Sequence, residues 1–204
     1  MPPRRCSSFR LLAVACWVGL ALLVAACAAS FDPSGPCTTD GRAAGAYPDL
    51  EALVPRDLAG MPATQVDSGR NCSEKALGSL KSHGVDELRF AGAVWETGPN
   101  GGVSSAVLEA PNLRADWVHE FYKTGAEAGR NTEQVTFESN AVDGTMFYRM
   151  NTLNGESYQT VVDWQDGDRV RVVIVASFIR QTSVGQHDRI VEDVIRSAMA
   201  ANGN

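Results

Sequence analysis

Residues 157–178 read SYQTVVDWQDGDRVRVVIVASF, and the strongest prediction about the fold comes from this stretch. Apolar and polar side chains alternate on both sides of the central Asp166-Gly167 pair, which is the pattern of two β-strands. An Asp-Gly dipeptide between two such runs is a strong signal for a tight turn. We therefore predict a β-hairpin made of Ser157 to Gln165 and Arg169 to Phe178.

The pairing of these two strands can be predicted from their side chains. A strict two-residue turn at Asp166-Gly167 would place Trp164 opposite Arg169. A shift of one residue would place Trp164 opposite Val170 and Asp163 opposite Arg171 instead. The shifted register separates apolar from polar side chains and pairs opposite charges across the strands. We therefore predict the shifted register and a longer loop.

Four more strands extend this hairpin into a sheet. Two strands are predicted at Glu133 to Ser139 and Gly144 to Met150, directly before the hairpin. An earlier hairpin is predicted from the alternating stretches Glu87 to Glu96 and Val103 to Glu109, which flank a turn-forming TGPNGG sequence. The sequence thus predicts a mainly antiparallel sheet of about six strands.

The remaining periodic segments predict helices. The clearest runs from Leu113 to Gly129, with Asn112 as its cap and His119 on its solvent side. A final helix is predicted to end at Met199, with Thr182 or Ser183 as its cap. Two shorter helices are predicted in the segments 47–55 and 73–83. Strands and helices together predict an α+β fold, in which helices pack on the sheet.

The first 27 residues have the features of an export signal. Arg4, Arg5 and Arg10 are followed by 16 uncharged residues, Leu11 to Ala26. This stretch is short for a membrane span and typical of the apolar region of a signal peptide. Val24-Ala25-Ala26-Cys27 resembles the lipobox of bacterial lipoproteins. The resemblance implies cleavage before Cys27, a diacylglycerol on its sulfur, and acylation of its new amino group, as with palmitate.

Two other interpretations of this segment remain open. An ordinary signal peptide could be cleaved after Ala26 or Ala29, which would leave a secreted soluble protein. The segment could also stay uncleaved as an anchor. Under the lipoprotein interpretation, residues 1–26 are the signal peptide. Residues 27–46 are the lipidated cysteine and a flexible tether rich in Ala, Ser, Gly, Pro and Thr. Residues 47–204 then form one α+β domain.

The segment DLEALVP (residues 49–55), followed soon by Gly60, is similar to uncharacterised exported lipoproteins of GC-rich bacteria. This resemblance implies no particular activity.

Export also suggests roles for the other cysteines. Cys6 and Cys16 would leave with the signal peptide, and Cys27 would carry lipid. The two that remain, Cys37 and Cys72, would lie in an oxidising compartment, where a disulfide is their natural pairing. Such a bond would stabilise the fold by about 4 kcal/mol on the chain-entropy estimate. A redox pair or a metal site is the alternative, but their spacing is far from C-x-x-C.

Charge argues against one class of partner. The chain carries 24 acidic and 18 basic residues, and loss of residues 1–26 would change its net charge from −6 to −9. Such an acidic body repels phosphate backbones, so we expect no nucleic-acid partner.

The sequence contains no familiar catalytic or metal-binding motif. HExxH, G-x-S-x-G and the P-loop pattern are all absent, and His83, His119 and His187 are scattered. A triad built on His187 stays open as a minor alternative, as does a binding groove lined by Trp95 and Tyr158. The acids between Asp163 and Asp168 are interpreted as a hairpin tip, because their spacing does not fit a calcium loop.

The sequence therefore predicts a non-catalytic lipoprotein with no cofactor, anchored by lipid on the extracytoplasmic face of the cell membrane. It would bind a ligand or a protein partner in the cell envelope through residues that the sequence does not identify. An envelope hydrolase with dispersed catalytic residues and a purely structural protein are the alternatives.

Overall fold

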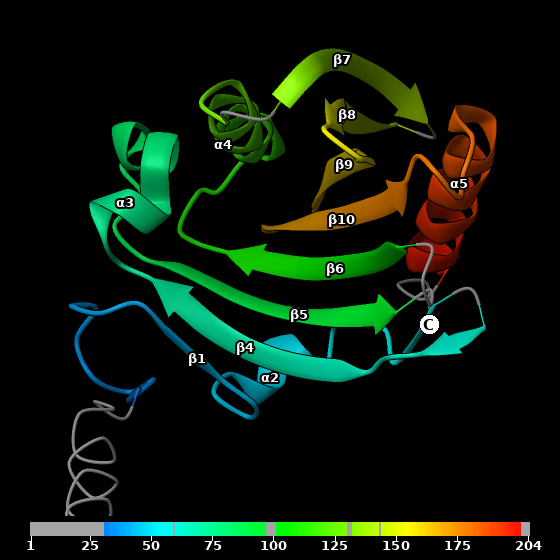
Figure 1. Cartoon of the computed structure of the whole chain (residues 1–204). Coiled ribbons are helices and arrows are strands. Elements are labelled where there is room, and N and C mark those ends of the chain that lie inside the picture. The colour runs from blue at the N-terminus through cyan, green and yellow to red at the C-terminus, as the bar shows by residue number, and fades with distance from the viewer. Residues whose placement is uncertain (1–30, 59, 97–100, 130–131, 143, 201–204) are drawn as a thin grey trace, which may run out of the picture. The chain divides into compact units, whose positions relative to one another are not determined.

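The structure is a computed structural model that describes residues 31–58, 60–96, 101–129, 132–142 and 144–200. The predicted signal peptide and Cys27 lie outside these ranges. Within them the chain forms one eight-stranded antiparallel sheet in the order β1-β4-β5-β6-β10-β9-β8-β7 (Figure 1). A separate two-stranded sheet pairs β2 with β3.

The ten strands have the following bounds: β1 Gly41–Ala43, β2 Asp57–Leu58, β3 Met61–Pro62, β4 Gln65–Asn71, β5 Leu88–Glu96, β6 Gly101–Glu109, β7 Thr132–Val142, β8 Thr145–Asn154, β9 Ser157–Asp166 and β10 Arg169–Phe178. The helices are α2 Pro48–Glu51, α3 Glu74–Leu77, the 3₁₀-helix η1 Gly78–His83, α4 Ala115–Glu127 and α5 Val184–Ala200.

Helices cover both faces of the sheet, so the domain has two hydrophobic cores. On one side, here called the α5 face, α5 and α2 pack on a cluster that includes Trp95, Val162 and Trp164. On the other, here called the α4 face, α4 and η1 pack on a cluster that includes Met150 and Val161. Alternation along each strand sends neighbouring side chains to the two cores, which explains why β9 and β10 are apolar on both faces.

The predicted fold class is wrong. The chain is β-rich, with eight strands in one sheet and a further two-stranded sheet, where a balanced α+β fold of about six strands was expected. The additional strands of the large sheet are β1 and β4. The sequence of β4, QVDSGRN, has five polar side chains, one apolar side chain and a glycine, so it lacks the alternation that identifies a strand.

The predicted hairpin is present, but its predicted register is wrong. Trp164 pairs with Arg171, and a two-residue Gly167-Asp168 turn joins Asp166 to Arg169. Gly167 has a φ of +63°, and a glycine with positive φ at the first turn position is typical of a type II′ turn. The prediction assumed that one face of the hairpin is polar. Helices cover both faces here, so separation of apolar from polar side chains does not determine the register.

The disulfide between Cys37 and Cys72 is confirmed, with a Cα–Cα distance of 5.5 Å. The flexible tether expected at 27–46 needs correction in its described part. Residues 31–46 contain Cys37 and β1, which pairs with β4 at the edge of the sheet. This pairing requires glycine at position 69 of β4, because a Cβ there would overlap the carbonyl oxygen of Gly41.

The predicted helices are present with altered ends. Ser183 caps α5, since its Oγ accepts a hydrogen bond from the Gln186 amide while the Gln186 side chain accepts one from the Ser183 amide. Asn112 does not cap α4, whose first flanking residue is Arg114. Asn112 instead adopts a left-handed conformation, with φ of +58°, in the turn before the helix.

Candidate functional site

A groove on the α5 face runs between α5 and the strands β7, β8 and β9. It consists of two adjoining cavities of about 360 and 420 Å³. Glu138, Arg149 and Glu192 line both cavities, so the two form one continuous site, which we call the α5 groove. The groove is bounded by β7, the edge strand of the sheet.

The two halves of the α5 groove differ in chemistry. The first half is polar and includes Asn151, Tyr158 and His187. The second half has an apolar floor made of Val142, Phe147, Val162, Ile195 and Met199. Val142 and Met199 are exposed although both are large and apolar. A groove with one polar and one apolar half suits a ligand that has the same division.

Arg149 fixes the boundary between the halves. Its Nη2 donates to Asp188 Oδ1 at 2.6 Å, and its Nε donates to Asn151 Oδ1 at 2.8 Å. These bonds connect β8 to the first turns of α5 and hold the guanidinium group in place. The charge of Arg149 is thereby neutralised by Asp188. The other two carboxylates of the groove, Glu138 and Glu192, form no ion pair among the described residues.

His187 lies deep in the polar half and is 3% exposed. Its Nδ1 lies 3.0 Å from Ser177 Oγ, and its Nε2 lies 2.8 Å from Thr160 Oγ1. Thr160 Oγ1 also donates a hydrogen bond to Asn151 Oδ1 at 2.9 Å, so toward His187 it accepts a hydrogen bond from Nε2–H. Burial lowers the pKa of His187, so the ring is neutral at pH 7 and joins α5 to β9 and β10 through hydroxyl groups.

The bonds of His187 do not form a catalytic triad. Both of its ring nitrogens bind hydroxyl oxygens, and no carboxylate hydrogen-bonds to them within the part of the chain that the structure describes. Asp188, the neighbouring acid, bonds to Arg149 instead. Ser177 is itself buried, so its Oγ cannot reach a substrate in the groove.

The other two histidines lie on the α4 side of the sheet. His83 stacks on Trp117 and bonds to Glu120 Oε2 at 2.8 Å. His119, expected in solvent, is 14% exposed, and its Nδ1 lies 3.2 Å from Asp163 Oδ2. Asp163 is fully buried, which raises its pKa to about 6, and its Oδ1 has no hydrogen-bond partner among the described residues. The i, i+4 spacing within the helix placed His119 on the solvent side. It could not predict the pair with Asp163, because Asp163 lies on β9, far away in the sequence.

The groove suggested for Trp95 and Tyr158 does not form. Trp95 is fully buried in the core of the α5 face, so it cannot contact a ligand from solvent. Tyr158 does line the polar half of the α5 groove.

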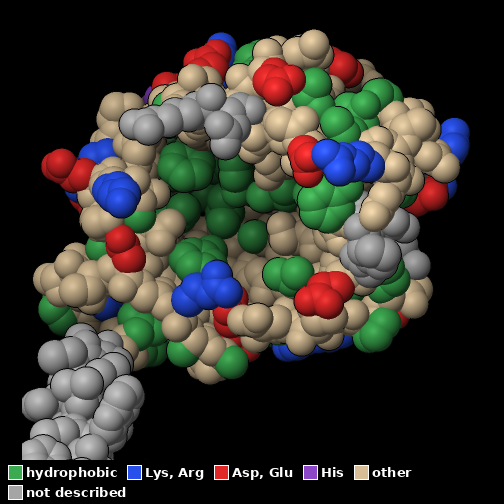
Figure 2. Space-filling view, in the orientation of Figure 1, with side chains coloured by type: hydrophobic (Ala, Val, Ile, Leu, Met, Phe, Trp, Pro, Cys, Tyr) green, Lys and Arg blue, Asp and Glu red, His purple; other side chains and the backbone are tan. Residues whose placement is uncertain are grey.

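Two further cavities lie elsewhere. One of about 530 Å³ lies between α4, η1 and the ends of β8 and β9, and Phe121, Tyr122 and Val161 contribute to its lining. In the view of Figure 2 the molecule is hollowed beside α4, with hydrophobic side chains on the floor of the hollow. The other, of about 910 Å³, is lined by charged residues such as Glu87, Arg89 and Glu109, which pair with one another or with neighbouring charges.

The described ranges lack both a metal-binding cluster and a membrane-spanning helix. There, no cluster of three His, Cys, Asp or Glu side chains has an arrangement that could hold a metal ion. Within the same ranges, no helix is both long and apolar enough to cross a membrane.

Comparison with known proteins finds a distant similarity to a solved structure. No family model matches the sequence, and no curated protein matches it. The solution structure of cyanobacterial PsbP (CyanoP) from Synechocystis sp. PCC 6803 is similar to 80% of this chain and 93% of that chain. The identity is 14% and the TM-score is 0.40. A similarity at this level carries no argument about the function of this chain.

Proposed function

We propose that this chain is a non-catalytic bacterial lipoprotein, anchored through Cys27 on the extracytoplasmic face of the cell membrane, that binds a small amphiphile in the α5 groove. The observation that carries the binding proposal is the groove itself, which joins a polar half at Arg149 to an apolar half over Phe147 and Ile195.

The charges of the groove favour a particular kind of ligand head. Arg149 is neutralised by Asp188, whereas Glu138 and Glu192 line the boundary without an ion pair among the described residues. An ammonium or another hydrogen-bond donor placed there would be attracted to both carboxylates, whereas a carboxylate head would be repelled. The apolar half would take a short alkyl tail.

The absence of a complete catalytic group in the groove supports binding over hydrolysis. His187 is neutral and held by two hydroxyl groups, and the serine next to it is buried. The lipid anchor is supported by the Val24-Ala25-Ala26-Cys27 sequence and by the charge and length of the segment before it.

The ligand proposal is tested with three probes that share one tail: octylammonium, octanol and octanoate. Titrations followed by calorimetry and by amide chemical shifts should rank them in that order of affinity. The double variant Glu138→Gln/Glu192→Gln should reduce the preference for octylammonium over octanoate by about tenfold, since each carboxylate supplies roughly 1 kcal/mol or less near the surface. Met199→Asp should weaken all three.

Glu127→Gln is the matched control, because Glu127 is exposed at the end of α4 and does not line the groove. It should leave the ranking and the affinities unchanged. Binding in this groove would be refuted if none of the three probes changed the amide chemical shifts of α5 and β8. The anchor has its own test: Cys27→Ser should block both acylation and cleavage of the precursor, and a normally processed mutant would refute it.

A further inference from the structure

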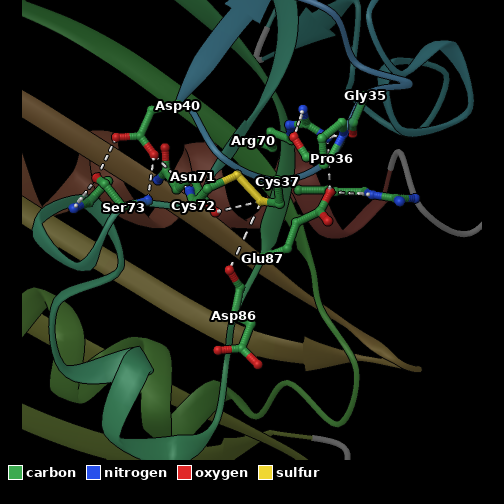
Figure 3. The surroundings of a disulfide bond; sticks show 12 residues. Gly35, Pro36, Cys37, Asp40, Arg70, Asn71, Cys72, Ser73, Asp86 and Glu87 are labelled. Atoms are coloured by element: carbon green, nitrogen blue, oxygen red, sulfur yellow. Dashed lines mark hydrogen bonds and ion pairs between the residues drawn. A yellow bond between two sulfur atoms is a disulfide. The ribbon is translucent and has the colours of Figure 1, made fainter.

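The segment from Phe31 to Asp40, here called the strap, is bonded to the domain along its whole length. The Cys37–Cys72 disulfide joins it to the end of β4. Asp40 completes the attachment, since its Oδ1 accepts hydrogen bonds from the amides of Cys72 at 2.6 Å and Ser73 at 2.8 Å (Figure 3). The side chain of Ser73 adds a bond to Asp40 Oδ2 at 2.5 Å.

Arg70 holds the other half of the strap. It lies on β4, is 3% exposed, and directs its guanidinium group at the strap backbone. Four carbonyl oxygens accept from it, at distances from 2.7 to 3.4 Å: those of Asp32, Pro33, Gly35 and Pro36. A buried guanidinium group that loses its acceptors is strongly destabilising, so Arg70 opposes release of the strap.

The strap also packs on the domain at its first residue. The guanidinium carbon of Arg70 lies 5.6 Å from the centre of the Phe31 ring, and Phe31 packs against the core of the α5 face. Gly41 makes room for that ring, because a Cβ at this position would overlap it. The domain is therefore bonded to its N-terminal segment from Phe31 onward.

We propose that the strap holds the lipidated domain close to the membrane, with the β1–β4 edge of the sheet nearest the bilayer. This proposal rests on the proposed acylation of Cys27. Only four peptide units separate Cys27 from Phe31, and at about 3.5 Å each they span at most about 14 Å. With the strap released, the free segment would extend to Gly41 and could span about 49 Å.

The same geometry places the α5 groove away from the anchor. The strap joins β4 beside β1 at one edge of the sheet, whereas β7, which lines the groove, is the opposite edge (Figure 1). An eight-stranded sheet is about 34 Å wide at about 4.8 Å per strand pair before curvature shortens it. The groove thus faces the envelope space while the strap side faces the bilayer.

The test uses the full-length acylated protein in phospholipid vesicles that contain an acceptor dye at the headgroup level. A donor dye is attached through Asp86→Cys, since the Asp86 carbonyl oxygen lies 4.0 Å from Cys37 Sγ, or through Ser139→Cys on β7. Energy transfer should be at least twofold greater from position 86 than from position 139. Twenty Gly and Ser residues inserted after Ala29 should reduce transfer from position 86 by at least half.

Variants of the strap separate its role from that of the anchor. Cys37→Ala/Cys72→Ala combined with Arg70→Met should reduce transfer from position 86 as the insertion does. Arg180→Met, at an exposed arginine that pairs with Glu156, should not change it. Near-ultraviolet circular dichroism will show whether the core of each variant is intact. If the triple variant loses its core, Arg70→Met with the disulfide retained replaces it. The free segment would then extend to Cys37 and could span about 35 Å, so transfer from position 86 should still decrease, by less than with the insertion.

Equal transfer from positions 86 and 139, or an intact strap variant that matches the wild type, would overturn the proposal while leaving the anchor in place. Mass spectrometry of the N-terminal peptide distinguishes this result from failure of the anchor. A peptide without an acyl group on Cys27 would overturn the anchor, and the short distance from the bilayer with it.

Discussion

His119 Nδ1 lies 3.2 Å from Asp163 Oδ2, so a fully buried carboxylate on β9 holds α4 against the sheet. Tyr148 lies directly across from Asp163 on β8, and Tyr122 and Asp116 of α4 are close enough to interact with it electrostatically. Among the described residues, His119 is therefore the one side chain that hydrogen-bonds to the Asp163 carboxylate. This arrangement makes the stability of the domain depend on pH.

Burial raises the pKa of Asp163 from 3.8 to about 6, so between these values the folded state binds more protons than the unfolded state. Its contribution to the free energy of unfolding is thus complete below pH 4 and is lost as the pH rises through 6. A shift of this size corresponds to about 3 kcal/mol. Urea unfolding from pH 4 to pH 7.5 should show a decrease that Asp163→Asn abolishes.

The control for this prediction is Asp32→Asn. Hydrogen bonding from Ser34 lowers the pKa of Asp32, so its proton linkage acts below the chosen window, and Asp32 is not among the groups that interact with Asp163. That variant should retain the wild-type slope between pH 4 and pH 6. Parallel wild-type and Asp163→Asn curves would show that Asp163 does not titrate in this range.

His187 should produce the opposite dependence on pH. Burial lowers its pKa below 6.5, so the unfolded state binds more protons in the interval below that value. Its contribution is present above pH 6.5 and is lost as the pH falls through the folded-state pKa. In His187→Gln, stability should decrease less on acidification than in the wild type. The comparison is best made in an Asp163→Asn background, where a decrease equal in both proteins would contradict the prediction.

The hairpin shows what sequence patterns can and cannot determine. Alternation correctly indicated two strands around Asp166 and Gly167, because every strand in a sheet follows that period. It failed for the register because Trp164 and Arg171, which form a pair, both lie in the buried layer under α2 and α5. The guanidinium group of Arg171 is satisfied there by a carbonyl oxygen from another element, a partner that strand patterning cannot reveal.

The sequence patterns did not predict the candidate site or the ordered strap, for a related reason. The α5 groove unites residues of β7, β8 and α5, whose side chains have no common spacing along the chain. The strap is rich in small residues and prolines, a composition typical of a flexible tether. Its order depends on Arg70 and Asp40, and their bonds join segments more than 30 residues apart.

Gly69 should be essential for the edge of the sheet. Because a Cβ there would overlap the Gly41 carbonyl oxygen and the Arg42 side chain, Gly69→Ala should separate β1 from β4. Amide exchange should then increase at Arg42 and Ala43. Gly125→Ala is the matched control, since its Cβ would meet no atom within 4 Å. Gly125 lies in the last turn of α4, where alanine should stabilise the fold by up to about 0.8 kcal/mol. Unchanged exchange in Gly69→Ala would refute this role.

Arg171 should contribute more to stability than its ion pair alone suggests. Its Nη1 donates to the Leu53 carbonyl oxygen at 2.6 Å, and its Nε donates to Asp166 Oδ2 at 2.8 Å, so it links the end of α2 to the central hairpin. Arg171→Met should cost about 1–3 kcal/mol in urea unfolding, because the Leu53 carbonyl oxygen loses its charged donor. Asp166→Asn should cost less than 1 kcal/mol, since Asp166 is 41% exposed. If Arg171→Met is as stable as the wild type, apolar packing replaces the buried charge without loss, as it can in other cores.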